Sequence, residues 1–118
     1  MTIEEIDERY KLITDKNNLG KNCRGTSLYL LGFIEQDCDF DPKQFFLECE
    51  KNRYERNETG PVGSIAIWND GRYVAAHTAI KIGENNFVHR KGAEGKIKVE
   101  SLEDMFIGRE PDFYMRKK

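Results

Sequence analysis

The fold is decided by residues 64–100, SIAIWNDGRYVAAHTAIKIGENNFVHRKGAEGKIKVE. Apolar and β-branched residues fall into short runs here, and glycine and asparagine separate the runs. Residues 64–68 predict a strand, and Asn69-Asp70-Gly71 is a strong hairpin signal. Further strands are expected over 72–82, 87–90 and 96–100, with turns at 83–86 and 92–95. This part of the chain therefore predicts a meandering antiparallel sheet.

Helices are expected before this sheet. Apolar residues at helical spacing predict a helix over 3–14, with Thr2 as its N-cap. A second helix is expected from Cys23 to Ile34, and a third from Asp41-Pro42 to about residue 53. Residues 55–63 are interpreted as a polar connection, 101–106 as a short helix and 113–115 as a last strand. Helices followed by an antiparallel sheet define an α+β class, and residues 1–118 are expected to form one domain.

The charge balance narrows the function classes. The 118 residues include 19 Lys and Arg against 21 Asp and Glu, which leaves a net charge of −2. This balance argues against a simple basic nucleic-acid binder and against a protein held electrostatically on a membrane. Charged residues make up 34% of the chain, above the ~25% of an average domain, so the surface is expected to be well solvated.

Neither an export signal nor a membrane span is evident. Residues 1–8 lack the basic and apolar regions of a secretory signal, and no apolar run approaches the ~20 residues that cross a bilayer. The chain is therefore expected either to be cytoplasmic or to be delivered outside without a classical signal. Its three cysteines do not form a disulfide framework, and Cys38 and Cys49 are interpreted as structural.

The two histidines of the chain are expected to meet on one hairpin. His77 and His89 are twelve residues apart, with Gly83 at the midpoint. An even spacing places both imidazoles on one face of the sheet when the turn has an odd number of residues, whereas a two-residue turn does so only with a bulge.

Cys23 is expected at the start of a helix, where backbone N–H groups and the positive end of the helix dipole converge. These groups and the neighbouring Arg24 favour a thiolate, and the N–H groups can also stabilise an oxyanion. Gly25 leaves room for the close approach of a substrate. A thiol facing a histidine is the arrangement that nucleophilic cysteine chemistry needs, with a second polar group to orient the base.

Other interpretations of these residues stay open. Cys23 can be a buried small hydrophobe, and the histidines can be ordinary strand residues. A zinc site made from Cys23, His77 and His89 is also chemically reasonable, but the chain lacks a local pair of ligands, and no metal or other cofactor is expected.

The ordered set of motifs resembles the NlpC-type cell-wall cysteine peptidases, which have a papain-like fold. Those proteins combine a D-C-S-G-like motif at a helix start, a G-D-aliphatic strand, an H-V-G-I-x-x-G segment and a further histidine about twelve residues on. The matching stretches here are Asn22-Cys23-Arg24-Gly25, residues 63–68, residues 77–83 and Phe87-Val88-His89. CHAP-type amidohydrolases are a near neighbour, but the second histidine fits the NlpC pattern better.

The resemblance implies Cys23 as nucleophile, His77 as base and His89 as orienting residue. It also implies hydrolysis of a peptide or isopeptide bond through a thioacyl intermediate, commonly in peptidoglycan stem peptides, and substrate contacts from Asn22, Arg24 and Gly25. The chain departs from the pattern in lacking the Tyr-x-Trp-Gly-Gly stretch and the aspartate before the cysteine. Two alternatives follow: a catalytically silent papain-like domain that binds a peptide or protein partner, and a cytosolic protein-amide hydrolase.

Overall fold

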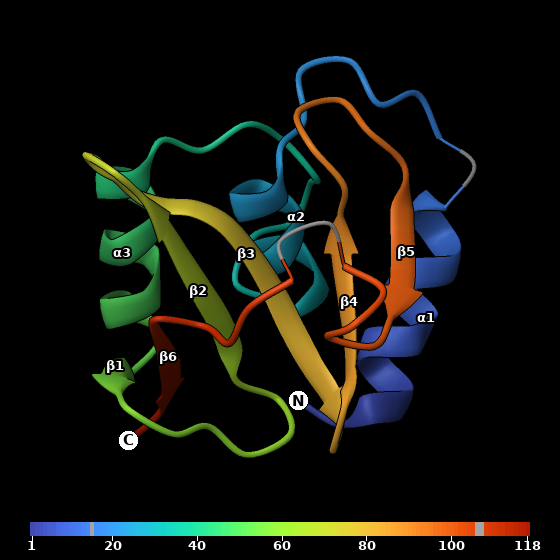
Figure 1. Ribbon diagram of the computed structural model, residues 1–118. Helices are drawn as coiled ribbons and strands as arrows, with labels where there is room; N and C mark the ends of the chain where they lie inside the picture. The colour runs from blue at the N-terminus through green and yellow to red at the C-terminus, as the bar shows by residue number, and fades with distance from the viewer. Residues whose placement is uncertain (15, 106–107) are drawn as a thin grey trace.

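The computed structural model describes residues 1–14, 16–105 and 108–118. Within them, three helices pack against one antiparallel sheet of six strands (Figure 1). The helices are α1 (Ile3–Ile13), α2 (Cys23–Leu30) and α3 (Pro42–Lys51). The strands are β1 (Tyr54–Asn57), β2 (Ile65–Asp70), β3 (Tyr73–Gly83), β4 (Asn86–Arg90), β5 (Ile97–Glu100) and β6 (Phe113–Lys117). They are ordered β1-β6-β2-β3-β4-β5, and the predicted α+β class is confirmed.

The helices begin where the sequence predicts. Thr2 forms a capping box with Glu5 at α1, and Asp41 accepts a hydrogen bond from the Gln44 N–H at the start of α3. The predicted extension of α2 to Ile34 is wrong. Gly32 has a φ of 78° and its N–H bonds to the Tyr29 carbonyl, while the next N–H bonds to the Leu28 carbonyl, which ends the helix at Leu30.

Two predicted segments differ from the structure. The interval 55–63, interpreted as a polar connection, overlaps the edge strand β1, which pairs with β6. Its side chains are mostly exposed, so its sequence carries no apolar alternation. The short helix expected over 101–106 is a turn over the residues described, and Phe106 lies outside them. Leu102 and Met105 each pack against the sheet from this turn.

The sheet has two covered faces. The helices cover one face, where the core includes Leu28, Phe45 and Ile80. The chain after β5 crosses the other face, as the orange-red segment of Figure 1 shows. There Trp68 packs with Phe87 and Met105, and its indole N–H donates to the Arg109 carbonyl at 2.8 Å. Both histidines lie on this second side, because strand residues alternate between the two faces.

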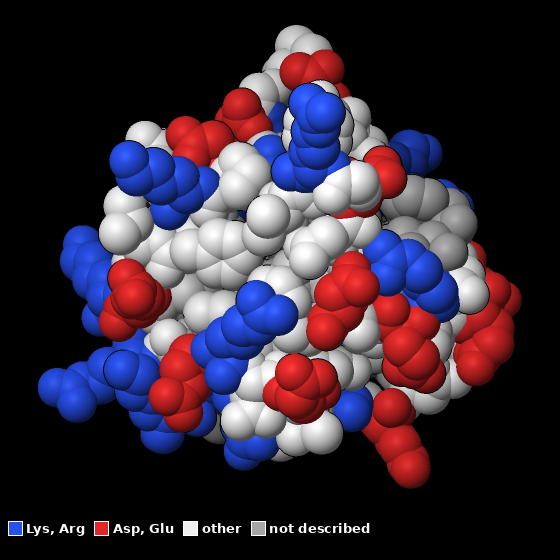
Figure 2. Space-filling view, turned by 60° about the vertical axis from the view of Figure 1, so that its left-hand side comes forward, with Lys and Arg blue, Asp and Glu red and all other residues white. Residues whose placement is uncertain are grey.

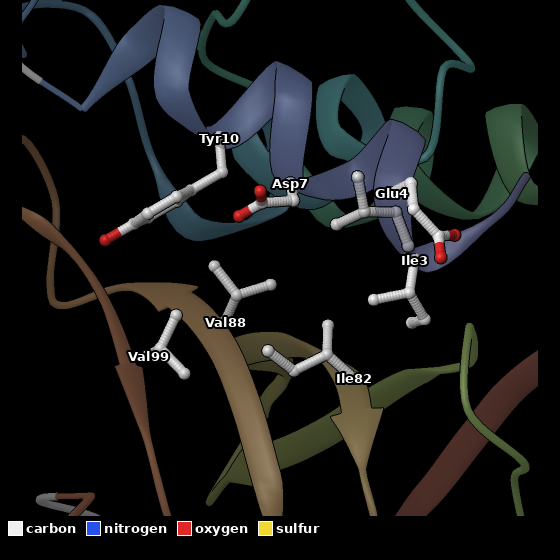
Figure 3. A pocket seen from close by; sticks show the side chains of 8 residues that line it. Ile3, Glu4, Asp7, Tyr10, Ile82, Val88 and Val99 are labelled. Atoms are coloured by element: carbon white, nitrogen blue, oxygen red, sulfur yellow. The ribbon is translucent and has the colours of Figure 1, made fainter.

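An apolar pocket of about 210 Å³ lies between α1 and the sheet (Figure 3). Strands β3, β4 and β5 form its floor, and Glu4, Asp7 and Tyr10 stand along the helix above it. None of its lining residues lines the cleft described below. The lining residues are Ile3, Glu4, Ile6, Asp7, Tyr10, Ile82, Val88 and Val99.

The charged side chains are mixed in sign over the face shown in Figure 2, around an uncharged central area. This face therefore offers no uniformly basic surface for a polyanion. Over residues 1–14, 16–105 and 108–118, no helix combines the length and the apolar character that a membrane crossing needs.

Candidate active site

The two histidines are brought together by a bulge in the β3–β4 hairpin. The hairpin turns through Glu84 and Asn85, a two-residue turn that by itself would place His77 and His89 on opposite faces. The pairing shifts by one residue between Lys81 and Gly83, and this shift returns both imidazoles to one face. The Nε2 atom of His77 lies 2.8 Å from the Nδ1 atom of His89.

The position of Cys23 is set by contacts between α2 and β3. Cys23 is the first residue of α2, and its carbonyl accepts a hydrogen bond from the Thr78 hydroxyl at 2.9 Å. The Ser27 hydroxyl lies 2.8 Å from the same Thr78 oxygen. The Cys23 sulfur lies 3.8 Å from the carbonyl oxygen of Ala76, the residue before His77. These contacts hold the thiol against the part of β3 that carries the histidine.

Cys23 and His77 line one cleft of about 350 Å³. Residues 92–94 of the loop between β4 and β5 line one side of this cleft. The loop runs next to the chain that leads into α2, at the top of Figure 1. The Glu94 N–H donates to the Lys21 carbonyl at 2.9 Å, and the Gly20 N–H donates to the Glu94 carboxylate at 3.1 Å, so the two segments are tied together. The lining residues are 20–24, Asp39, Ala76, His77 and 92–94.

The pKa values of Cys23 and His77 differ from those that a position at a helix start would favour. Burial raises the pKa of the Cys23 thiol, and this effect outweighs the Arg24 charge and the N–H groups of Arg24 and Thr78, which lower it. The expected bias toward a thiolate is therefore wrong for the free protein. Burial, with the nearby His89, lowers the pKa of His77 to about 3. At neutral pH the resting pair is therefore a thiol and a neutral imidazole.

Because His77 is buried in its neutral form, we expect acid to destabilise the fold. A histidine in the unfolded chain has a pKa near 6.5, whereas His77 in the folded chain stays neutral down to about pH 3. Between these values the unfolded chain binds a proton that the folded chain does not. Stability is therefore unaffected above pH 6.5 and falls as the pH decreases below it, by about 1 kcal/mol per pH unit.

This pH dependence can be measured by urea unfolding between pH 7 and 5, followed by the fluorescence of Trp68, the single tryptophan. The His77→Asn variant lacks the titrating group, so its free energy of unfolding should fall less steeply over this range. Equal slopes for the two proteins would show that His77 is not held neutral by burial.

The residues beside Cys23 mainly bind the chain that follows α2. The Asn22 carboxamide accepts the Gly25 N–H at 3.0 Å and donates to the Phe40 carbonyl at 2.9 Å and to Asp39. The Arg24 guanidinium donates to the Phe40 carbonyl at 2.6 Å and to the Ala75 carbonyl at 2.9 Å. Asn22 and Arg24 line the cleft, and both shape its wall through these main-chain contacts.

Gly25 has a packing role in this arrangement. It is buried, and a Cβ atom there would lie 1.5 Å from the carbonyl oxygen of Cys38. We therefore expect Gly25→Ala to force the two backbones apart and to lower the free energy of unfolding by about 3 kcal/mol. Gly83→Ala is the matched control, because its Cβ would meet neighbours at an ordinary 3.5 Å. Similar urea midpoints for the two variants would contradict this packing role.

Two groups near the site carry no sequence signal of their own. Glu100, at the end of β5, accepts a hydrogen bond from His89 Nε2 at 2.9 Å. Arg90, next to His89, is fully buried and pairs with Asp37 at 2.6 Å. Glu100 reaches His89 because of the register between β4 and β5, and Asp37 reaches Arg90 because of the path of the chain after α2. Only the tertiary structure provides these two contacts.

The zinc interpretation has no support in the site geometry. In the described part of the chain, no three His, Cys, Asp or Glu side chains are placed to hold a metal ion. The facing nitrogens of His77 and His89 are hydrogen-bonded to each other instead.

The fold is that of the NlpC/p60 domains, a papain-like fold, which confirms the resemblance inferred from the motifs. The NlpC/p60 domain of the peptidoglycan hydrolase SagA has a TM-score of 0.64 with this chain at 20% identity, and the match covers 98% of both chains. The P60 domain of antigen MAP1204 from M. avium subspecies paratuberculosis has a TM-score of 0.60 at 14% identity, covering 98% of this chain and 93% of that one. No family model and no curated protein matches the sequence.

Proposed function

We propose that the protein is a cysteine amidohydrolase that cleaves a peptide or isopeptide bond, with Cys23 as nucleophile, His77 as base and His89 as orienting residue. The observation that carries the proposal is the hydrogen-bonded histidine pair, one member of which lines the same cleft as a thiol at a helix start. A nucleophile, a base and a third group that orients the base are the parts that such chemistry requires.

The neutral resting pair suits a mechanism in which the proton moves as the substrate is attacked. His77 takes the proton from Cys23 while the sulfur bonds to the carbonyl carbon. N–H groups in the first turn of α2 stabilise the oxyanion. His77 then gives the proton to the departing amine nitrogen as the C–N bond breaks, which leaves a thioacyl group on Cys23. Water, activated by His77, releases the acid and restores the thiol.

Peptidoglycan stem peptides are the proposed substrate class. The likeness to a domain of a peptidoglycan hydrolase supports this choice. The cleft also presents Lys21, Asp39 and Glu94, charged groups of both signs that suit a substrate carrying amino and carboxyl groups. Asn22 and Arg24 line the same cleft and are the proposed substrate contacts beside the thiol, with Gly25 setting the position of the wall through its packing.

The experiment is incubation with soluble peptidoglycan fragments and, in parallel, with unfolded proteins, followed by mass spectrometry of products and of the intact enzyme. Cleaved stem peptides together with an acyl adduct on Cys23 are expected. Cleavage of proteins alone would instead favour the protein-amide hydrolase. Saturable binding of fragments without product and without an adduct would favour the silent binding domain, and would overturn the proposed activity.

A further inference from the structure

A carboxylate extends the histidine pair into a chain of three groups. The Glu100 Oε1 atom lies 2.9 Å from His89 Nε2, and His89 Nδ1 lies 2.8 Å from His77 Nε2. The three groups come from three neighbouring strands, β5, β4 and β3. His89 is almost fully buried, and the Glu100 side chain is only 15% exposed. Such a chain is shielded from water, so each hydrogen bond strongly constrains the next.

The carboxylate dictates where the protons are. A carboxylate only accepts hydrogen bonds, so His89 carries its proton on Nε2. A neutral imidazole has one proton, so His89 Nδ1 must accept a hydrogen bond from the protonated Nε2 of His77. The remaining nitrogen of His77, Nδ1, then carries no proton and can accept one from the Cys23 thiol.

Without the carboxylate, the opposite arrangement becomes available. His89 can then carry its proton on Nδ1 and donate to His77 Nε2, which moves the His77 proton to Nδ1. In this tautomer His77 cannot accept a proton from the thiol on that side. A base held in the wrong tautomer loses most of its catalytic effect even when its position is unchanged.

We infer that Glu100 is a positioning residue, which sets the tautomer of His77 through His89 and so makes His77 a base toward Cys23. This role rests on the proposed function, because it concerns the same thiol and the same base. Glu100 acts without touching the substrate, since it is separated from His77 by the whole His89 ring.

The strand register explains why Glu100 can fill this role. His89 pairs with Lys98 across β4 and β5, and Glu100 lies two residues further along the same face. The diagonal position lets the carboxylate reach the outer nitrogen of His89, whereas Lys98 directly opposite can only donate. A single register shift in β5 would move Glu100 to the other face and remove the contact.

The inference can be tested by long-range proton–nitrogen correlation spectra of isotope-labelled protein, because the chain has only two histidines. In the unmodified protein both rings should be protonated on Nε2. In Glu100→Met the protons of both rings should move to Nδ1, and kcat on a stem-peptide substrate should fall on the order of 100-fold with little change in KM. Glu100→Ala serves the same test if the methionine variant does not fold.

Two further variants control this experiment. Glu100→Gln keeps the size of the side chain, but its amide can donate to His89 Nε2 as well as accept from it, so the protons should shift toward Nδ1 and kcat should fall although the packing is unchanged. Glu103 is an exposed carboxylate that accepts a hydrogen bond from Asn85. Glu103→Gln should therefore change neither the histidine tautomers nor kcat.

The outcomes distinguish a failure of the role assigned to Glu100 from a failure of the proposed hydrolysis. Unchanged tautomers in Glu100→Met would overturn the inference whatever the activity, and so would switched tautomers with an unchanged kcat. Switched tautomers in a protein whose unmodified form hydrolyses nothing would support the control exerted by Glu100, while the proposed hydrolysis would fail.

Discussion

Replacing Cys23 with alanine is expected to reduce kcat/KM for amide hydrolysis on the order of 10⁴-fold or more, because the covalent route then has no nucleophile. His77→Ala should reduce the rate by a comparable factor. The double variant should be no slower than either single one, since a nucleophile and its base act as one unit. Product formation measured by chromatography at equal enzyme concentrations checks all three variants.

Cys38→Ala is the matched control for this experiment. Cys38 is half-buried and does not line the cleft, so its replacement should leave kcat/KM within a few-fold of the value for the unmodified protein. Activity above one tenth of normal in Cys23→Ala would mean that another group attacks the substrate. Strictly additive losses in the double variant would mean that His77 and Cys23 act in separate steps.

The second large effect concerns stability and arises from Arg90. Its guanidinium is fully buried and donates to Asp37, to the Thr26 hydroxyl at 2.8 Å, to Asn18 at 2.6 Å and to the Gly95 carbonyl. The Asp37 side chain is only 2% exposed. These contacts link the end of β4 to α2 and to the loops on either side of the cleft.

Arg90→Met is expected to lower the free energy of unfolding by about 4 kcal/mol, because it leaves the Asp37 carboxylate buried without its partner. Adding Asp37→Leu to this variant should recover much of the loss, since a buried pair replaced as a whole by apolar groups costs far less than a broken pair. Urea unfolding followed by Trp68 fluorescence measures each variant.

Lys11→Met is the control, because it breaks an exposed ion pair instead of a buried one. It removes an exposed pair between Lys11 and Asp7 and should change the free energy of unfolding by less than about 1 kcal/mol. A loss below about 1 kcal/mol in Arg90→Met would show that the buried network contributes little. A double variant less stable than Arg90→Met would show that the unpaired carboxylate is not the source of the loss.

Local sequence signals were sufficient to predict most of the helices and strands. Thr2, Asp41-Pro42 and Asn69-Asp70-Gly71 mark element boundaries through short-range chemistry, and the structure places boundaries close to each of them. The order of Cys23, His77 and His89 indicated the NlpC/p60 fold. Such signals act within a few residues, so they can be interpreted without knowing what lies across the molecule.

Long-range contacts decided the rest. The strand β1 has no apolar alternation and exists because the C-terminal strand pairs with it. The spacing of the histidines allowed one face or two, and the bulge between Lys81 and Gly83 decided for one. The state of the Cys23 thiol followed from burial, which the position at a helix start does not reveal.

The sequence by itself therefore determined the class of fold and the hairpin that carries both histidines, and it singled out the thiol that lines one cleft with His77. The tertiary structure alone decided the protonation of the pair, the packing of Gly25 and the connection from His89 to Glu100. The physical reason is that desolvation and hydrogen bonding between strands depend on what the folded chain places around a group, and residues far apart in the sequence supply those surroundings.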